Sequence, residues 1–314
     1  MIWGAHGGAG ATTLATWLQP AWDMGPARLT HRGLGPAIQQ DWLAGYAPAG
    51  WDALTRHLRA AEYSETVIEA AGLARRSRRG TLIDAFRDRA MLPIHSPDGT
   101  IIAFIGRAPS HAGPGTPKYL NSPSTALYDK SEVLFGLWEA CDALANGARP
   151  TIVEGPLDAI ADRSRYAGLA PCGTSLTARH AAALDHAADL RTTGGIVAFD
   201  PDDARQRAAV RAYHLLVPYT DKLAALKLPD RQDPAAILAN SGTAALAETL
   251  AQHIRPLPDL VVNAELRQWT PPPRELRRRP ARRTTRHRSP DRRPHTSPAR
   301  SPASPPSSSS TTQP

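Results

Sequence analysis

The sequence predicts an α/β fold, in which a parallel sheet with flanking helices follows a smaller α+β segment. In residues 146–265, short apolar β-branched runs alternate with helical patterns. In residues 30–145, helical patterns accompany a hairpin signal. Parallel strands need long crossover connections, usually helices, so this alternation indicates a parallel sheet covered on both faces.

The segment 30–145 is expected to contain two helices and a hairpin. Asp52 opens the first helix, Ser64 caps the second, and Gly72 ends it. The residues expected to point inward are Leu54 and Leu58 in the first helix and Val67, Ile68 and Ala71 in the second. Strands at 91–95 and 101–106 flank Pro97-Asp98-Gly99, whose residue types are typical of a turn.

The segment 146–265 is expected to supply the parallel sheet. Strands are predicted at 151–153 and 195–199, and helical patterns follow them at 157–166 and 204–216. About 46 residues separate the two strand ends, which leaves room for further strand and helix elements between them.

The last residues, 270–314, are rich in Arg, Pro and Ser and are expected to form a disordered tail. From 271 onward there are eleven Arg and two acidic residues, a net charge of +9. The whole chain has a formal charge of +8, so residues 1–270 carry about −1. The tail is either a solvated extension or a non-specific clamp on nucleic acid phosphates.

Composition excludes several classes of protein. The chain has 314 residues, 41% of them apolar, and no apolar run long enough for a membrane helix. With two cysteines, Cys141 and Cys172, it can build neither a disulfide framework nor a cysteine-rich zinc module. No secretion signal precedes it, so a cytoplasmic protein without zinc and without a membrane partner is expected.

Carboxylates follow both predicted strands of the sheet. Glu154 comes directly after the first strand, and Asp200 and Asp202 come after the second. Each half by itself is typical of helix caps. Together, at the carboxyl edge of a parallel sheet, the three side chains are expected to converge on Mg²⁺ or Mn²⁺, which prefer oxygen ligands. Such a cation assists phosphoryl transfer.

These residues resemble a known family. Val153-Glu154-Gly155-Pro156-Leu157-Asp158 and Phe199-Asp200-Pro201-Asp202 are similar to the Toprim signature, shared by bacterial-type primases, topoisomerases and some nucleases. The flanking segments resemble the primases in particular. These segments are 87–94, 104–107, 117–123, 128–130, 134–137, 173–177 and 228–234. The resemblance covers about His31 to Val262 and implies a Toprim domain preceded by a primase core N-terminal subdomain.

The resemblance implies roles for individual residues. Glu154 would be a general acid/base or metal ligand, Asp200 and Asp202 would hold the metals, Asp233 would lie at the margin of the metal site, and Asp158 would support the first motif. The groove for template and nucleotide would be lined by Arg107, Lys118, Asn121 and Lys130, with Arg87 and Arg89 adding to its basic surface. A further cluster, Arg75, Arg76, Arg78 and Arg79, fits a solvated loop and a DNA backbone contact equally well.

The function implied is Mg²⁺-dependent synthesis of short RNA primers from ribonucleoside triphosphates on single-stranded DNA, by a DNA-directed nucleotidyltransferase in DNA replication. A replicative helicase is a candidate partner. Pro201, Arg205 and Ala235 depart from the family pattern, and no zinc-binding or helicase-binding domain is recognised. These departures favour an alternative, a catalytically weak or inactive nucleic-acid-binding replication accessory. A Toprim nuclease is a third hypothesis.

Residues 7–14, Gly-Gly-Ala-Gly-Ala-Thr-Thr-Leu, resemble the phosphate loop of chromosome-partitioning ATPases. That loop needs a Lys to supply charge, and none is present here. The primase-like sequence begins within about 20 residues, which leaves no room for a nucleotide-binding domain. We therefore interpret residues 1–29 as a vestigial Gly-rich segment.

Overall fold

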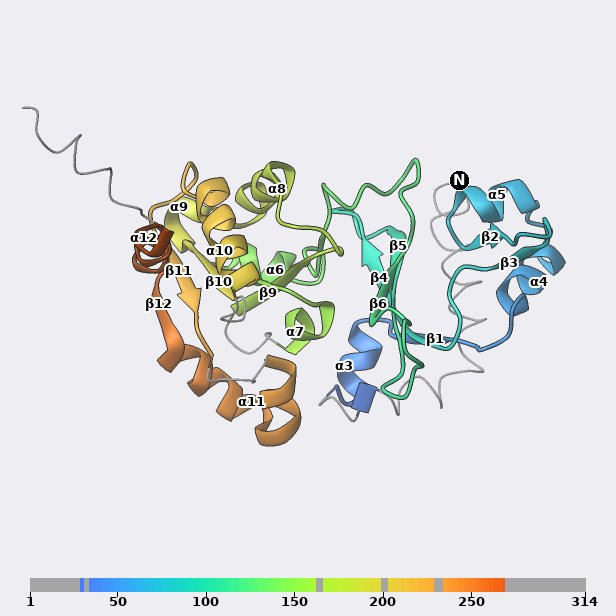
Figure 1. The fold of residues 1–314 in the computed structure, drawn as a ribbon, viewed down its shortest axis with the longest axis horizontal. Helices are drawn as coiled ribbons and strands as arrows, with labels where there is room; N and C mark the ends of the chain where they lie inside the picture. The colour runs from blue at the N-terminus through green and yellow to red at the C-terminus, as the bar shows by residue number, and fades with distance from the viewer. Residues whose placement is uncertain (1–28, 31–33, 162–165, 199–202, 229–233, 269–314) are drawn as a thin grey trace, which may run out of the picture. The chain divides into compact units, whose positions relative to one another are not determined.

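The structure, a computed structural model, describes residues 29–30, 34–161, 166–198, 203–228 and 234–268. Within these ranges the chain forms a four-stranded sheet, a six-stranded sheet and a two-stranded hairpin (Figure 1). None of the described helices has the length and apolar character needed to cross a membrane.

The four-stranded sheet is antiparallel and has the order β1-β4-β5-β6. Its elements and the preceding helix are α3 (Pro36–Asp41), β1 (Gly45–Ala47), β4 (Arg89–His95), β5 (Ile101–Arg107) and β6 (Tyr119–Asn121). The predicted turn joins β4 to β5: Gly99 has a φ of 83°, and its N–H donates to the carbonyl of Ser96 at 3.0 Å. The hairpin predicted from the sequence is therefore confirmed.

A smaller unit packs beside this sheet. It consists of α4 (Ala53–Ala60), α5 (Glu65–Ala70) and the antiparallel hairpin of β2 (Ala74–Arg76) and β3 (Leu82–Asp84). Ser64 caps α5 as predicted, since its side chain accepts from the Val67 N–H. Asp84 caps α4 from a distance: its carboxylate accepts from the N–H groups of Leu54 and Thr55 at 2.9 and 2.8 Å.

The six-stranded sheet has the order β12-β11-β10-β8-β9-β7. Its strands are β7 (Leu134–Phe135), β8 (Arg149–Val153), β9 (Tyr166–Pro171), β10 (Gly195–Ala198), β11 (Leu223–Leu226) and β12 (Ile254–Pro256). The four central strands are parallel, as predicted, while the edge strands β7 and β12 are antiparallel to their neighbours. The helices are α6 (Cys141–Ala145), α7 (Pro156–Ala161), α8 (Ala178–Ala188), α9 (Leu190–Thr193), α10 (Asp203–Leu216), α11 (Pro234–His253) and α12 (Leu257–Gln268).

Alternate strand residues supply two cores, one on each face of the sheet. Ile152 and Val197 pack with buried residues of α6, α8, α10 and α12. Val153 and Ile196, the next residues along, pack with buried residues of α7 and α11. Figure 1 shows α8 and α10 on one side of the sheet and α7 and α11 on the other. Both faces are therefore covered, as an all-apolar strand requires.

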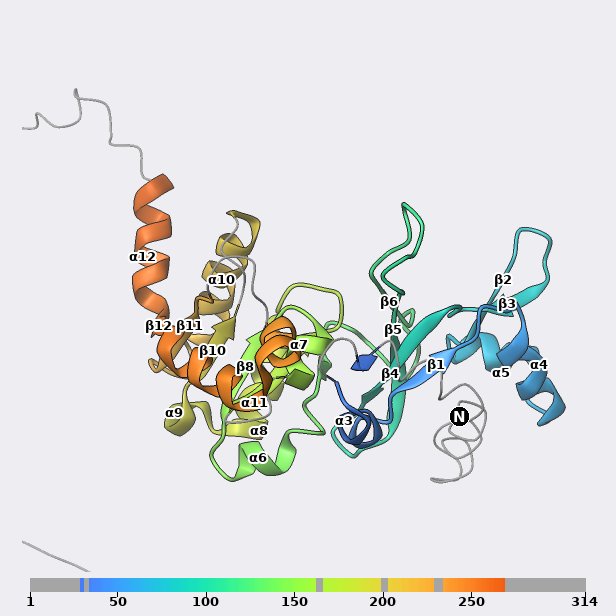
Figure 2. The same ribbon diagram turned by 90° about the horizontal axis from the view of Figure 1, so that it is seen from below.

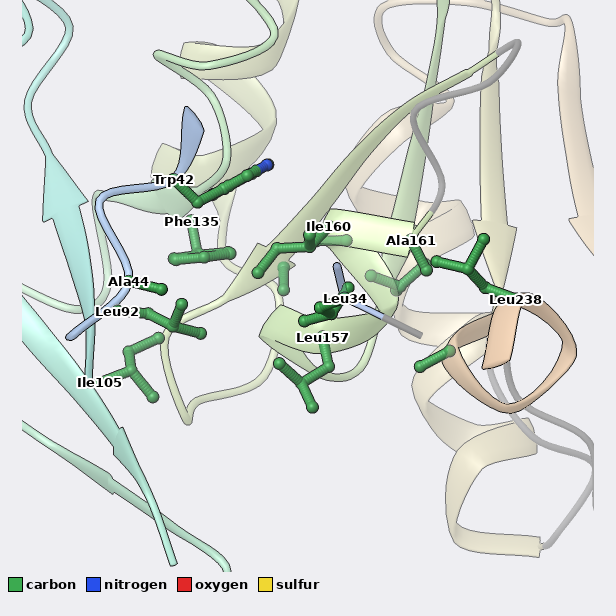
Figure 3. Packing of buried hydrophobic residues seen from close by; sticks show 14 of the residues in the cluster. Leu34, Trp42, Ala44, Leu92, Ile105, Phe135, Leu157, Ile160, Ala161 and Leu238 are labelled. Atoms are coloured by element: carbon green, nitrogen blue, oxygen red, sulfur yellow. The ribbon is translucent and has the colours of Figure 1, made fainter. Parts of the chain in front are cut away.

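The core beneath α7 continues into the four-stranded sheet. Leu92 and Ile105 of that sheet belong to the same buried cluster as Leu157 of α7 (Figure 3). Between them, Trp42 stacks on Phe135 with ring centroids 5.1 Å apart. One apolar core thus fixes the first acidic motif relative to the antiparallel sheet.

Two details of the predicted elements are wrong. The helix expected at 157–166 does not include Tyr166, which begins β9, and α7 is described over Pro156–Ala161. The segment Tyr166–Pro171 is short and contains small residues, so its sequence gives little sign of a strand. Its backbone nevertheless pairs with β8, and most of its residues are buried. Val67, expected inward, is 37% exposed, because Ile68 alone faces the core from that turn of α5.

Candidate functional site

The first acidic residue stands where the order of the strands reverses. β8 has β9 on one side and β10 on the other, so the chain turns both ways from β8. Open α/β sheets bind ligands at the carboxyl ends of strands at such a reversal. β8 ends at Val153, and Glu154 follows it as an exposed residue. The local topology therefore places Glu154 at the position where this class of sheet has its site.

β10, the strand that precedes Asp200 and Asp202 in the sequence, ends next to β8, the strand that precedes Glu154. Val153 and Ala198, the last residues of β8 and β10, are paired in register. Neighbouring strands are about 4.8 Å apart, so the two strands end side by side. Asp200 and Asp202 themselves lie outside the described residues.

A third acidic segment follows β11, the next parallel strand. It contains Asp233, which also lies outside the described residues. Among the residues that the structure describes, no group of three or more His, Cys, Asp or Glu side chains could hold a metal. Glu154 is thus the one predicted ligand whose position is described, and the metal set as a whole remains a prediction.

Asp158 joins the first acidic motif to the segment after β11. It lies in the first turn of α7, and its Oδ1 accepts from the Ala235 N–H, at the start of α11, at 3.4 Å. A carboxylate is favourable at a helix N-terminus because the exposed N–H groups there carry partial positive charge. Ala235, which departs from the acidic family pattern, is 5% exposed and packs in the core. The supporting role of Asp158 stays a prediction, and this contact is the observation that favours it.

A cationic and aromatic cluster from the antiparallel sheet faces the first motif. A Cβ added at Gly155 would lie 3.6 Å from the hydroxyl of Tyr119 on β6. The Lys118 ammonium and the Arg107 guanidinium lie 5.6 and 5.7 Å from the Tyr119 ring centroid, within cation–π range. The structure thus brings the predicted Arg107 and Lys118 to the ring of Tyr119, whose hydroxyl lies beside the residue that follows Glu154.

Arg107 is buried without full use of its donors. Its side chain is only 8% exposed, and its Nε has no hydrogen-bond partner among the described residues. A buried N–H without a partner costs free energy, so the structure keeps Arg107 in this position at a cost to stability. The contact with the Tyr119 ring is the one favourable interaction of its guanidinium that is described.

Asn121 contacts the loop that follows β9, the neighbour of β8 in the sheet. Its Nδ2 donates to the carbonyl of Cys172, the residue after β9, at 3.2 Å. Gly173 comes next with a φ of 71°, and a Cβ there would lie 2.1 Å from this Nδ2. Only glycine fits, both for its backbone conformation and for its close approach to Asn121. The Oδ1 of Asn121 is buried and has no hydrogen-bond partner within the described part of the chain.

Lys130 is held by the N-terminus of α8. The Nδ1 of His180 accepts from the Thr177 N–H at 3.2 Å, so its proton is on Nε2, which donates to the carbonyl of Lys130 at 3.1 Å. Burial lowers the pKa of His180 and favours this neutral form. The Thr177 hydroxyl also donates to the carbonyl of Ser131 at 2.6 Å. The backbone of Lys130 is fixed while its side chain is exposed.

The two remaining predicted arginines have different surroundings. Arg89 is 6% exposed, and its Nη1 donates to the carbonyls of Gly106 and Pro117, both at 3.0 Å. We interpret Arg89 as a positioning residue that holds the segment before Lys118. The guanidinium of Arg87 instead lies 4.3 Å over the ring of Trp51, which is 63% exposed.

Trp51 and Tyr119 are functional candidates that reasoning from the sequence did not single out. Tyr119 lay within a segment of family resemblance but carried no charge to mark it. Trp51 precedes a predicted helix, where an exposed ring has no packing role. A large aromatic residue at a loop position beside a helix cap is the signal that could have found it.

The comparisons with known proteins match the two halves of the site. Residues 24–141 match the family "DNA primase catalytic core, N-terminal domain", and residues 151–238 match "Toprim-like". A curated relative, the DNA primase of Streptomyces coelicolor, is 37% identical over 234 residues, which are 73% of this chain and 36% of that protein. The chain spans about two fifths or less of the length of the curated relatives it matches.

Solved structures give the same result. The RNA polymerase domain of the Mycobacterium tuberculosis primase DnaG is 32% identical, with a TM-score of 0.72, over 81% of this chain and 85% of that one. A DnaG primase catalytic domain bound to single-stranded DNA is 30% identical, with a TM-score of 0.68, over 83% and 84%. The α/β fold with a Toprim domain is confirmed, and the chain belongs to the family of DnaG-type DNA primase catalytic cores.

Proposed function

We propose that this chain synthesises short RNA primers from ribonucleoside triphosphates on a single-stranded DNA template, as a primase-type nucleotidyltransferase in DNA replication. The observation that supports this best is the juxtaposition of Gly155, next to Glu154 at the strand-order reversal, with the Arg107–Tyr119–Lys118 cluster. A carboxylate edge beside a cationic and aromatic surface suits a polyanionic nucleotide and its template.

The donor set suits a hard divalent cation. Glu154 is an exposed carboxylate at the carboxyl edge of the sheet, and the paired strand β10 leads directly to Asp200 and Asp202. Mg²⁺ and Mn²⁺ prefer oxygen ligands such as carboxylates, and no cysteine lies next to these acidic residues in the sequence. We propose that these three residues hold the metal, with Asp233 at the margin. When bound, the cation would neutralise triphosphate charge.

The chain's own residues would do the remaining work. In primer extension, the 3′-oxygen bonds to the α-phosphorus, the bond to pyrophosphate breaks, and the hydroxyl loses its proton. Glu154 would accept that proton or help to hold the metal. Lys118, Arg107 and Asn121 would orient the phosphates and the nucleotide through their charged and polar side chains.

The direct test is RNA synthesis by the full chain. With single-stranded DNA, the four ribonucleoside triphosphates and Mg²⁺ or Mn²⁺, we expect short RNA products that a chelator abolishes. Asp200→Asn should lose them, because an amide cannot supply the carboxylate charge. Asp221→Asn, the same change at an exposed site after α10, should keep them.

Other outcomes of this assay would overturn the proposal. DNA shortening in place of RNA synthesis would identify a Toprim nuclease. DNA binding without product in the wild type, unchanged by Asp200→Asn, would identify a non-catalytic replication accessory.

The template strand is proposed to pass over Trp51 and Arg87. Stacking of a base on an aromatic ring is worth about 1–3 kcal/mol, so Trp51→Ala should weaken binding of single-stranded DNA roughly 5- to 150-fold. Fluorescence anisotropy with a labelled oligonucleotide measures this. Trp51→Phe, which keeps a ring, should lose much less. Equal affinity of the alanine variant and the wild type would exclude Trp51 from the DNA path.

A further inference from the structure

The hairpin of β2 and β3 presents a group of arginines beyond the surfaces described so far. Arg75 and Arg76 are exposed at the end of β2, and Arg78 and Arg79 are exposed in the turn that follows. The base of the hairpin is anchored, because Leu82 is 2% exposed and packs against α4 and α5 residues. Figure 2 shows the loop between the two strands projecting away from α4 and α5.

Only one of these arginines has an obvious structural role. Arg76 makes ion pairs with Glu65 at 3.2 Å and Glu69 at 3.3 Å, and so ties the hairpin to α5. The side chains of Arg75, Arg78 and Arg79 have no acidic partner within ion-pair distance among the residues that the structure describes. Three uncompensated like charges within five residues repel one another, and an anionic partner would relieve that repulsion.

The hairpin is continuous with the Trp51–Arg87 stack. The carbonyl of Trp51 accepts from the N–H of Asp84, the last residue of β3, at 2.7 Å. Arg87 donates to the carbonyl of the same Asp84 at 2.6 Å. Arg75 is paired in register with Ile83, the residue before Asp84. Burial and the charge of Arg75 lower the pKa of Arg87, in keeping with this proximity. The aromatic ring, Arg87 and Arg75 thus follow one another toward the turn.

We propose that the β2–β3 hairpin extends the path of single-stranded DNA, with Arg75, Arg78 and Arg79 binding backbone phosphates beyond the Trp51–Arg87 stack. This inference rests on the proposed function, which supplies the template strand. The contacts are to phosphates, so the hairpin adds affinity and salt dependence without sequence preference.

The experiment compares two triple variants of the full chain that have the same net charge. Arg75→Ala/Arg78→Ala/Arg79→Ala removes the hairpin charges. Arg191→Ala/Arg211→Ala/Arg255→Ala, the matched control, removes three exposed arginines from α9, α10 and β12. Affinity for labelled oligothymidylate is measured by anisotropy over a range of salt concentrations.

For a long oligonucleotide, the hairpin variant should lose about 2 units of the slope of log K against log salt, since each phosphate contact on a single strand contributes about 0.7. The control variant should keep a slope close to that of the wild type. A short oligonucleotide that cannot reach the hairpin should bind both variants alike. Equal slopes for the two variants on the long strand would overturn the inference.

A second variant guards against misfolding. Arg78→Glu changes one exposed turn residue, so its thermal unfolding should match that of the wild type while its affinity for the long strand falls. Unchanged affinity in this folded variant would also overturn the inference. RNA synthesis by the wild type is scored separately. If the wild type makes RNA but the hairpin and control variants have equal salt slopes, only the hairpin inference is rejected. If the slopes differ as expected but the wild type makes no RNA, only the proposed function is rejected.

Discussion

Glu154→Gln is expected to lower RNA primer synthesis by about a hundred- to ten-thousand-fold, the range found for removal of a general acid or base. This corresponds to about 2.7–5.5 kcal/mol of transition-state stabilisation. The amide has the size of the carboxylate, but it neither accepts a proton at neutral pH nor supplies charge to a cation. The measurement is initial-rate RNA synthesis at saturating template and nucleotide.

The control for this prediction is Glu265→Gln, the same chemical change at an exposed residue of α12. It should leave the rate unchanged. Both variants should bind single-stranded DNA as the wild type does, because the proposed DNA contacts come from the Trp51–Arg87 stack and the β2–β3 hairpin. A Glu154→Gln variant as active as Glu265→Gln would remove Glu154 from the reaction.

Gly168→Ala is expected to have the largest effect on stability. Gly168 lies in β9, directly beneath α7, and a Cβ there would lie 2.4 Å from the carbonyl oxygen and 2.8 Å from the Cα of Ala159. These are backbone atoms, so no side chain can move aside, and α7 must shift. Overpacking of this kind costs at least about 2 kcal/mol. The melting temperature should fall by about 4–8 °C.

The same substitution should also impair synthesis below the melting temperature, because α7 follows Glu154 directly and contains Asp158. Gly195→Ala is the matched control in the same sheet. A Cβ at Gly195 would meet only the Leu223 side chain, at an ordinary 3.5 Å. Circular dichroism melts of the two variants decide the matter, and equal melting temperatures would show that α7 does not pack as closely on Gly168 as described.

Local signals predicted the elements that depend on neighbouring residues. The β4–β5 hairpin was predicted because Pro97-Asp98-Gly99 sets a turn by its own backbone preferences. The cap at Ser64 was predicted because one hydroxyl satisfies an N–H three residues away. The strand from Tyr166 was missed because its only reason to be extended is pairing with β8, which belongs to another part of the chain.

Family resemblance predicted Arg107, Lys118 and Asn121 as site residues, but not how each is used. Arg107 and Lys118 flank Tyr119, and Asn121 bonds to the loop after β9. Trp51 was not predicted because its position beside Arg87 depends on Asp84, thirty-three residues later in the chain. The Asp84 carboxylate caps α4, and the Asp84 N–H donates to the Trp51 carbonyl.

The sequence by itself determined the α/β class, the family resemblance and the carboxylates that follow the strands, because these depend on residue type and on short spacings. Tertiary structure alone decided which strands are neighbours, how the register aligns the ends of β8 and β10, and which of the described arginines are buried, stacked or without an acidic partner in the described part of the chain. These depend on contacts between residues far apart in the chain, whose free energy no local pattern encodes.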